Sequence, residues 1–126
     1  MKSLADPYRA PDMSSFVQAR LAYLKIFNEV MKGKKLDALV FPQMYEDIPR
    51  IGQPGEIGAT TVSEINIAGL PGVNVPAGYY ASGAPFSIIF VGRLFDEAAL
   101  LGLAYDYEQA FHMRKTPDLM ENPGRQ

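Results

Sequence analysis

The sequence contains no cysteine and a single histidine, His112. The lack of cysteine excludes a disulfide framework, a zinc–thiolate site and a cysteine nucleophile. One imidazole could form a metal site only together with carboxylates, and the acidic residues are scattered apart from the neighbours Glu46 and Asp47. We therefore expect no metal site, and we interpret His112 as a helix-end cation or a partly exposed residue.

The sequence also lacks a strong net charge and a long apolar run. Twelve basic residues against fourteen acidic ones give a net charge of −2, which provides no electrostatic reason to expect nucleic acid or an anionic membrane as a partner. No apolar run approaches the roughly 18 residues that span a bilayer. The first residues, MKSLADPYRAP, lack the apolar core of a secretory signal. The expected location is therefore the cytoplasm.

The length of 126 residues suits a single domain, residues 1–126, with irregular tails at 1–11 and 119–126. Two stretches show helical periodicity, because their apolar residues recur at spacings of three and four. The first leads to Gly33, and its candidate caps are Asp12, Ser14 and Ser15. The second follows the candidate cap Asp96, carries basic residues at its end and stops before Pro117.

Three shorter stretches predict strands. Residues 36–42 form a nearly continuous apolar run, which is typical of a strand buried on both faces of a parallel or mixed sheet. Residues 73–77 and 86–92 are separated by a turn-rich segment and could pair as a hairpin. The whole order predicts an α/β chain with a small mixed sheet of about three strands and two long flanking helices.

Residues 42–62 carry several prolines and glycines and no periodicity. A loop of that length in a compact domain tends to be functional or mobile. The stretch TTVSEINI at its end predicts one or two helical turns, since a threonine followed by Glu64 resembles a capping box.

A search for reaction chemistry in the residues themselves finds no complete catalytic group. No Gly-x-Ser-x-Gly elbow, Walker loop or dinucleotide fingerprint is present. The neighbouring carboxylates fit a solvated loop, a helix start and a helix face better than a pair of general acids. Chemistry alone therefore predicts only an α/β domain.

Three stretches together carry a more specific signal: DALVFP at 37–42, NIAGLPGVNVPAG at 66–78 and GAPFSIIFVGRLFDEAALLGLAYDYEQA at 83–110. In this order and spacing they resemble the C-terminal portion of the amidase signature family, the Ser-Ser-Lys amidohydrolases. The resemblance covers roughly residues 36–112, most of the chain. It implies that the small sheet and its helices resemble the C-terminal part of the amidase-signature fold.

The resemblance also singles out positions that would be structural or pocket-lining. The family-motif positions are Asn66, Gly69, Pro71, Pro76, Gly78, Gly92, Arg93, Glu97 and Glu108. We expect the glycines to permit close backbone approach and the prolines to fix φ and to stop pairing beyond the strand. The sequence departs from the family pattern at Gly72, where alanine is usual, at Ile89, where glutamine is common, and across residues 83–87.

The family's Ser-Ser-Lys triad has no counterpart here. The only serine pair, Ser14–Ser15, is flanked by Met13 and Phe16 instead of glycines, so the resemblance assigns no catalytic residue. It implies a C-terminal segment of an amidase-type hydrolase, which would act on C–N amide bonds without a cofactor in the intact enzyme and would be inactive alone. Its partner would be a missing N-terminal amidase segment.

The alternative is a non-enzymatic, self-associating structural or binding module derived from an amidase, with a second copy as partner. An independent enzyme built on the loop at 42–62 is a third possibility, and no residue pattern supports it.

Overall fold

The computed structural model describes residues 10–49, 52, 55, 58 and 62–116. Its elements, in chain order, are α1 (Ser14–Gly33), β1 (Leu39–Pro42), α2 (Val62–Ala68), β2 (Gly72–Tyr79), β3 (Pro85–Val91) and α3 (Glu97–Phe111). The expected tails lie outside the described residues apart from Ala10 and Pro11, which have no regular structure. Much of the loop at 42–62 lies outside them as well.

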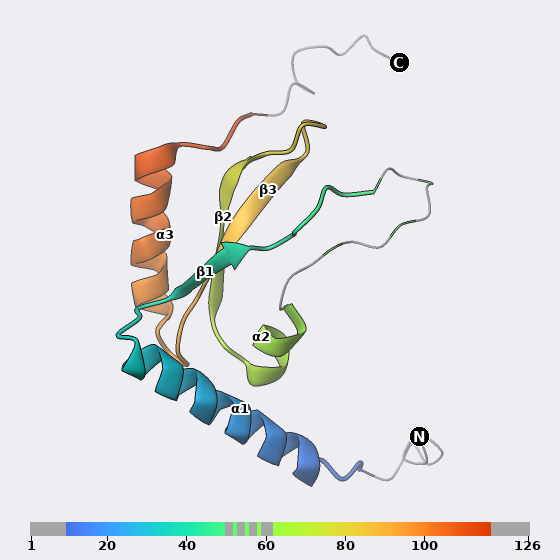
Figure 1. Ribbon diagram of the computed structural model, residues 1–126, viewed down its shortest axis with the longest axis vertical. Helices are drawn as coiled ribbons and strands as arrows, with labels where there is room; N and C mark the ends of the chain where they lie inside the picture. Colours follow the sequence, from blue (N-terminus) through green and yellow to red (C-terminus); the bar gives the residue numbers. More distant parts are fainter. Residues whose placement is uncertain (1–9, 50–51, 53–54, 56–57, 59–61, 117–126) are drawn as a thin grey trace.

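The three strands form one sheet in the order β1-β3-β2 (Figure 1). Both pairings are antiparallel, and β2 and β3 form the hairpin that the turn-rich segment between them predicts. The α/β class with about three strands and two long helices is confirmed. The expectation of a parallel or mixed sheet around β1 is wrong, because β1 runs antiparallel to its neighbour β3.

Helices cover both faces of this sheet. On one face, α1 packs through Leu24, Phe27 and Met31, and α2 packs through Ile65 and Ala68, against Ile89 and Val91 of β3. On the other face, α3 packs against the alternate residues of β3 and against β2. Consecutive residues of a strand point to opposite faces. The continuous apolar run of β3 is therefore typical of a strand whose two faces are both covered. In Figure 1, α3 stands along one side of the sheet, whereas α1 and α2 lie at its lower end.

The strand covered on both faces is therefore β3 and not β1. In β1, half-buried and exposed residues alternate, and the side chain of Val40 is 50% exposed. Val40 lies opposite Phe90, on the face where α3 packs over β2 and β3. β1 thus lies at the edge of the sheet, with one face only partly covered, which the local sequence did not reveal.

The ends of α1 differ from the expected caps. Met13 occupies the cap position without a side-chain bond, while Asp12 accepts hydrogen bonds from the amide of Ser14 at 2.9 Å and from its hydroxyl at 2.6 Å. At the other end, Lys35 adopts a left-handed conformation with φ of 54°. The amide of Leu36 donates to the carbonyl of Met31 at 2.9 Å, so a Schellman turn closes α1 without a glycine.

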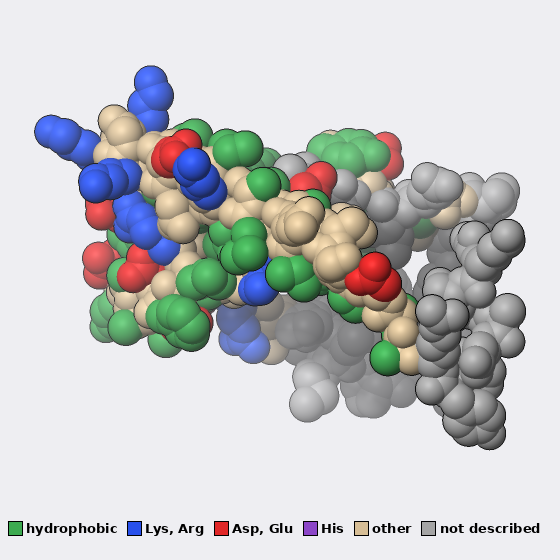
Figure 2. Space-filling view, turned by 90° about the horizontal axis from the view of Figure 1, so that it is seen from below, with side chains coloured by type: hydrophobic (Ala, Val, Ile, Leu, Met, Phe, Trp, Pro, Cys, Tyr) green, Lys and Arg blue, Asp and Glu red, His purple; other side chains and the backbone are tan. Residues whose placement is uncertain are grey.

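The apolar face of α1 is wider than the core that it covers. Leu24, Phe27 and Met31 are buried, whereas other apolar residues on both flanks remain exposed; the largest exposures are those of Ile26 (62%) and Leu21 (59%). Figure 2 shows this side of the molecule, where apolar side chains lie among the basic and acidic ones. A helix of this pattern is typical of one that contacts apolar partners on more than one side.

Candidate functional site

The first group of family-motif positions lies in the turn between α2 and β2. Gly69 has a φ of 71°, in the left-handed region. Its amide bonds to the carbonyls of Ile65 and Asn66, and the amide of Leu70 also reaches Ile65 at 3.1 Å. Ile65 and Leu70 meet in the same apolar core, which completes a Schellman turn. Glycine is favoured at this position because other residues are strained there.

An arginine from α1 seals this turn. The Nε of Arg20 donates to the carbonyl of Ala68 at 3.0 Å, which satisfies one of the free carbonyls at the end of α2. A Cβ on Gly69 would lie 2.9 Å from Nη2 of Arg20. The turn and the arginine are therefore packed against each other, and the sequence pattern around Gly69 gave no indication of Arg20.

The second group lies where β3 leads into α3, next to the first. The amide of Gly92 donates to the carbonyl of Pro71 at 3.2 Å, so the two connections run side by side. Arg93 donates to the carbonyl of Leu36 at 2.8 Å and lies 3.4 Å from a carboxylate oxygen of Asp96. Asp96 occupies the cap position of α3, but its side chain makes no capping bond. Arg93 thus links the segment before β1 to the segment that follows β3.

Glu97 begins α3, where a negative charge is favourable to the helix dipole. The first and second groups together lie at one end of the sheet and consist of Asn66, Gly69, Pro71, Gly92, Arg93 and Glu97. The contacts recorded for Gly69, Pro71, Gly92 and Arg93 are with backbone or with neighbouring side chains of this chain.

A third group, Pro76, Gly78 and Glu108, lies along β2 and at the end of α3. The strand continues through Pro76 to Tyr79 by means of an irregularity in the register between Pro76 and Gly78. The expectation that proline stops the pairing is wrong for Pro76. The physical reason is that β2 is an edge strand with a bulge, and a proline is tolerated in both places.

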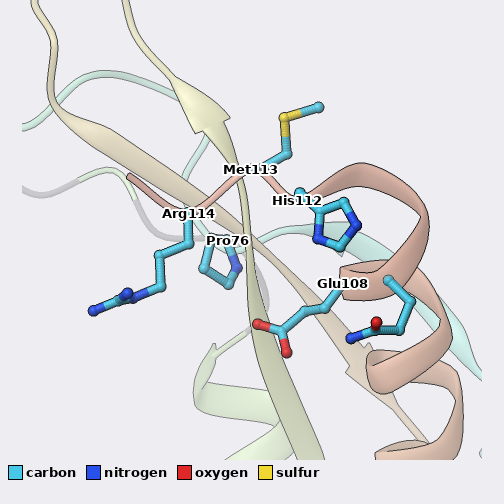
Figure 3. Close-up of a pocket in the computed structure, with 6 residues that line it drawn as sticks. Pro76, Glu108, His112, Met113 and Arg114 are labelled. Carbon is cyan, nitrogen blue, oxygen red and sulfur yellow. The ribbon is translucent and has the colours of Figure 1, made fainter. Parts of the chain in front are cut away.

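Pro76 and Glu108 line a polar hollow of about 220 Å³ together with Gln109, His112, Met113 and Arg114. Figure 3 shows the ring of Pro76 between the side chain of Arg114 and those of Glu108 and His112. The hollow holds a carboxylate, an imidazole and a guanidinium, and no serine, threonine, lysine or cysteine is among the described residues that line it. These residues therefore supply no hydroxyl, amine or thiol nucleophile for acyl transfer.

Another hollow lies between α2 and β2, and we call it the α2–β2 hollow. Its volume is about 310 Å³, and its lining consists of Gln43, Ile65, Asn66, Leu70, Gly72, Asn74 and Ile89. It brings Asn66 together with Gly72 and Ile89, the two single positions at which the sequence departs from the family pattern. A Cβ on Gly72 would lie 2.9 Å from Cδ1 of Ile89, so the larger residue at 89 occupies the space that an alanine at 72 would need.

Ser14 and Ser82 form hydrogen bonds that stabilise local turns. Ser14 donates to Asp12, and the hydroxyl of Ser82 accepts from the amide of Ala84 at 3.2 Å. In the part of the chain that the structure describes, no three histidine or acidic side chains cluster in a way that could hold a metal ion. None of the described helices combines the length and apolar character needed to cross a membrane.

Comparison with known proteins agrees with this architecture. Residues 4–101 match the Amidase family. The chain belongs to the Amidase family. It is 44% identical over 89 residues to a probable amidase of Arabidopsis thaliana, covering 71% of this chain and 14% of the relative. It is 37% identical over 98 residues to a glutamyl-tRNA(Gln) amidotransferase chain of Desulforudis audaxviator, covering 72% of this chain and 19% of that relative.

The backbone also resembles solved structures of the Amidase family. A peptide amidase crystallised with the competitive inhibitor chymostatin superposes with a TM-score of 0.72 at 26% identity, covering 91% of this chain and 24% of that one. An amidase family protein from Bacillus anthracis gives a TM-score of 0.69 at 28% identity, covering 91% of this chain and 20% of that one. The chain thus spans between 14% and 24% of the length of these four relatives.

Proposed function

We propose that this chain is the C-terminal segment of an amidase-type hydrolase and that it supports hydrolysis of a C–N amide bond only together with the remainder of such a domain. The observation that carries the proposal is the match of residues 4–101 to the Amidase family in a chain that spans at most 24% of the solved relative. The motif order from Asn66 to Glu108, which resembles the end of the family's domain, supports the C-terminal position.

The chemistry of the family explains why the chain alone would be inactive. Serine hydrolysis of an amide needs an activated hydroxyl that attacks the carbonyl, a base that accepts its proton and a water that releases the acyl-enzyme. The resemblance assigns neither the serines nor the lysine of the Ser-Ser-Lys triad to any position here. This segment would contribute the three-stranded sheet, the helices around it and part of the wall of the substrate pocket.

The exposed apolar surface supports a partner for this segment. Apolar residues on the flanks of α1 are between 39% and 62% exposed, and Ile67 on α2 is 54% exposed. Phe16, Tyr23 and Ile67 line an apolar groove of about 210 Å³ between these two helices. Surfaces of this kind in one layer of an α/β domain are normally covered by neighbouring elements. We expect the remainder of the amidase domain to cover them.

A chimera tests the proposal. The matching 24% of the peptide amidase chain is replaced with this chain, and ammonia release from a panel of carboxamides is measured. We expect release by the chimera and none by this chain alone or by the host body without a C-terminal segment. Ammonia release by the purified chain at the rate of the chimera would overturn the proposal. A folded chimera without activity, beside an active unmodified host, would contradict it too.

A second candidate is the self-associating module. It is favoured by β1, which pairs only with β3 among the described residues and so presents its outer edge, and by the half-exposed Val40 on that strand. An open edge next to apolar surface is a template for a second copy. Light scattering at rising concentration tests it: a stable dimer supports the module, whereas a monomer throughout the range counts against it.

A further inference from the structure

Helix α1 carries a second apolar stripe beside the one that it buries. The residues of this stripe recur at alternating spacings of three and four, and they are Phe16, Ala19, Tyr23, Ile26 and Val30. We call these five residues the outer seam of α1. Its last three members directly precede Leu24, Phe27 and Met31, which α1 buries against the sheet. A repeat of this spacing is typical of a helix whose side chains interlock with those of another helix along its length.

The outer seam is exposed. The exposed fractions of its four large residues lie between 39% and 62%, and Ala19 is exposed as well. Near the start of α1 the seam borders α2, where Phe16, Tyr23 and Ile67 enclose the apolar groove of about 210 Å³. Figure 2 shows basic side chains gathered towards the opposite end of α1. The seam is therefore a continuous apolar surface with a hollow at one end and positive charge at the other.

The order of residues along the seam fits a second copy of the same seam in the antiparallel direction. With Tyr23 at a two-fold axis, Phe16 of one copy faces Val30 of the other, and the small Ala19 faces the large Ile26. Large residues opposite small ones let two helices interdigitate without a void. Parallel seams would instead place Ala19 against Ala19 and Phe16 against Phe16, which leaves a gap at one level and crowds the other.

The charges beyond the two ends of the seam favour the same direction. Asp12 precedes Phe16 by four residues and Lys34 follows Val30 by four, so the two are equally far from Tyr23 along the chain. Both residues are exposed. Antiparallel seams bring Asp12 of one copy towards Lys34 of the other, whereas parallel seams bring like charges together. Antiparallel helices also place the positive end of one helix dipole beside the negative end of the other.

We infer that two copies of this chain associate through the outer seam of α1, antiparallel about a two-fold axis at Tyr23. The inference goes beyond the proposed function, because it concerns the chain without the remainder of an amidase domain. A second copy and that remainder exclude each other, since both cover α1. The contact also differs from pairing at the open edge of β1, because it joins helix to helix and leaves the sheet of each copy as it is.

Sedimentation of the full chain at rising concentration is the first test. We expect a monomer–dimer equilibrium with a dissociation constant on the order of 10 μM, because a single helix–helix contact lies at the low end of interface sizes. Ile26→Glu buries a charge in the seam and should raise that constant about tenfold or more. The matched control Leu101→Glu changes a similarly exposed residue of α3, 59% against 62%, and should leave the constant unchanged. Circular dichroism verifies that both variants keep the fold of the parent chain.

Disulfide cross-linking determines the direction of the two helices, and the chain has no cysteine of its own to interfere. A disulfide needs Cβ atoms roughly 4 Å apart, so in a two-fold dimer only a residue near the axis can pair with its own copy. Tyr23→Cys should therefore cross-link about tenfold or more faster than Tyr105→Cys, a control at an exposed tyrosine of α3. Phe16→Cys and Val30→Cys should each remain uncross-linked alone and should cross-link when mixed.

Each contrary result has a definite meaning. A monomer at every concentration up to about 1 mM would overturn the inference and leave the remainder of an amidase domain as the occupant of α1. Association that Ile26→Glu leaves intact, or cross-linking of Phe16→Cys with itself or of Val40→Cys on β1, would overturn it too. An inactive, folded chimera together with rapid cross-linking of Tyr23→Cys would remove the proposed function and keep the dimer. An active chimera together with a monomeric chain would do the reverse.

Discussion

Substitution of Gly69 by alanine is the sharpest test of how the α2–β2 turn is held. Two effects add at this position. An alanine at φ of 71° is strained by about 1–2 kcal/mol, offset by roughly 0.5 kcal/mol because alanine has fewer unfolded conformations than glycine. Its Cβ would also lie 2.9 Å from Nη2 of Arg20 and would push the guanidinium away from the carbonyl of Ala68.

The loss of that hydrogen bond sets the second effect. Hydrogen bonds to charged groups contribute roughly 1.5–3 kcal/mol, and we take the lower end because the Arg20 side chain is only partly buried. The expected decrease in the free energy of unfolding for Gly69→Ala is therefore about 2–3 kcal/mol. Urea unfolding followed by circular dichroism measures it.

Matched glycine-to-alanine substitutions separate the two effects. Gly83 has a φ of 87° and nothing within 4 Å of its Cβ position, so Gly83→Ala should show the strain alone, about 1 kcal/mol. Gly33 ends α1 with open space around it, so Gly33→Ala should stabilise the protein by about 0.5 kcal/mol. In an Arg20→Ala background, the decrease in the free energy of unfolding caused by Gly69→Ala should fall to that caused by Gly83→Ala. An equal decrease with and without Arg20 would refute the reasoning.

Three further predictions concern the ends of α1 and the core. Lys35→Gly should stabilise the protein by about 0.5–1 kcal/mol in urea unfolding, because φ of 54° strains a lysine; a destabilisation would contradict the assigned turn. Leu100→Ala should lower the free energy of unfolding by roughly 2–5 kcal/mol, since Leu100 is fully buried. Leu101→Ala, at a residue that is 59% exposed, should change the free energy of unfolding by under about 1 kcal/mol. The hydroxyl and then the amide of Ser14 lower the pKa of Asp12 below its ordinary value of 3.8. The stability from this contact is present above pH 3.8 and is lost as the pH falls through the lower, folded-state pKa, and Ser14→Ala should raise the pKa of Asp12 towards 3.8 in a carbon-13 titration.

The helices and strands could be predicted from the sequence because their signals are local. The spacing of Leu24, Phe27 and Met31 predicted α1, and the β-branched and aromatic run ending before Gly92 predicted β3. The helical turns predicted near Glu64 correspond to α2. The motif order from Asn66 to Glu108 pointed to the family to which the chain belongs. The signals for α1, α2 and β3 are each carried by residues within a few turns or one strand of one another, whereas the family signal lies in the order and spacing of motifs along the chain.

The candidate sites were harder to predict because their residues come from distant segments. Asn66 was chosen from a motif, but its neighbours Gln43 and Asn74 in the α2–β2 hollow carry no motif of their own. Arg20 was missed as the partner of the turn at Gly69, because it comes from α1, 48 positions before its hydrogen-bond partner Ala68. A polar residue on the buried side of an amphipathic helix is the one signal that could have pointed to Arg20.

The sequence by itself determined the elements, their order and the family, since periodicity, turn residues and motif spacing can all be read along the chain. Only the tertiary structure decided that β3 lies in the middle of an antiparallel sheet, that Pro76 continues a strand by a bulge and that a hollow opens between α2 and β2. These features depend on which apolar faces bury one another. That choice is made between segments far apart in the chain and leaves no local pattern.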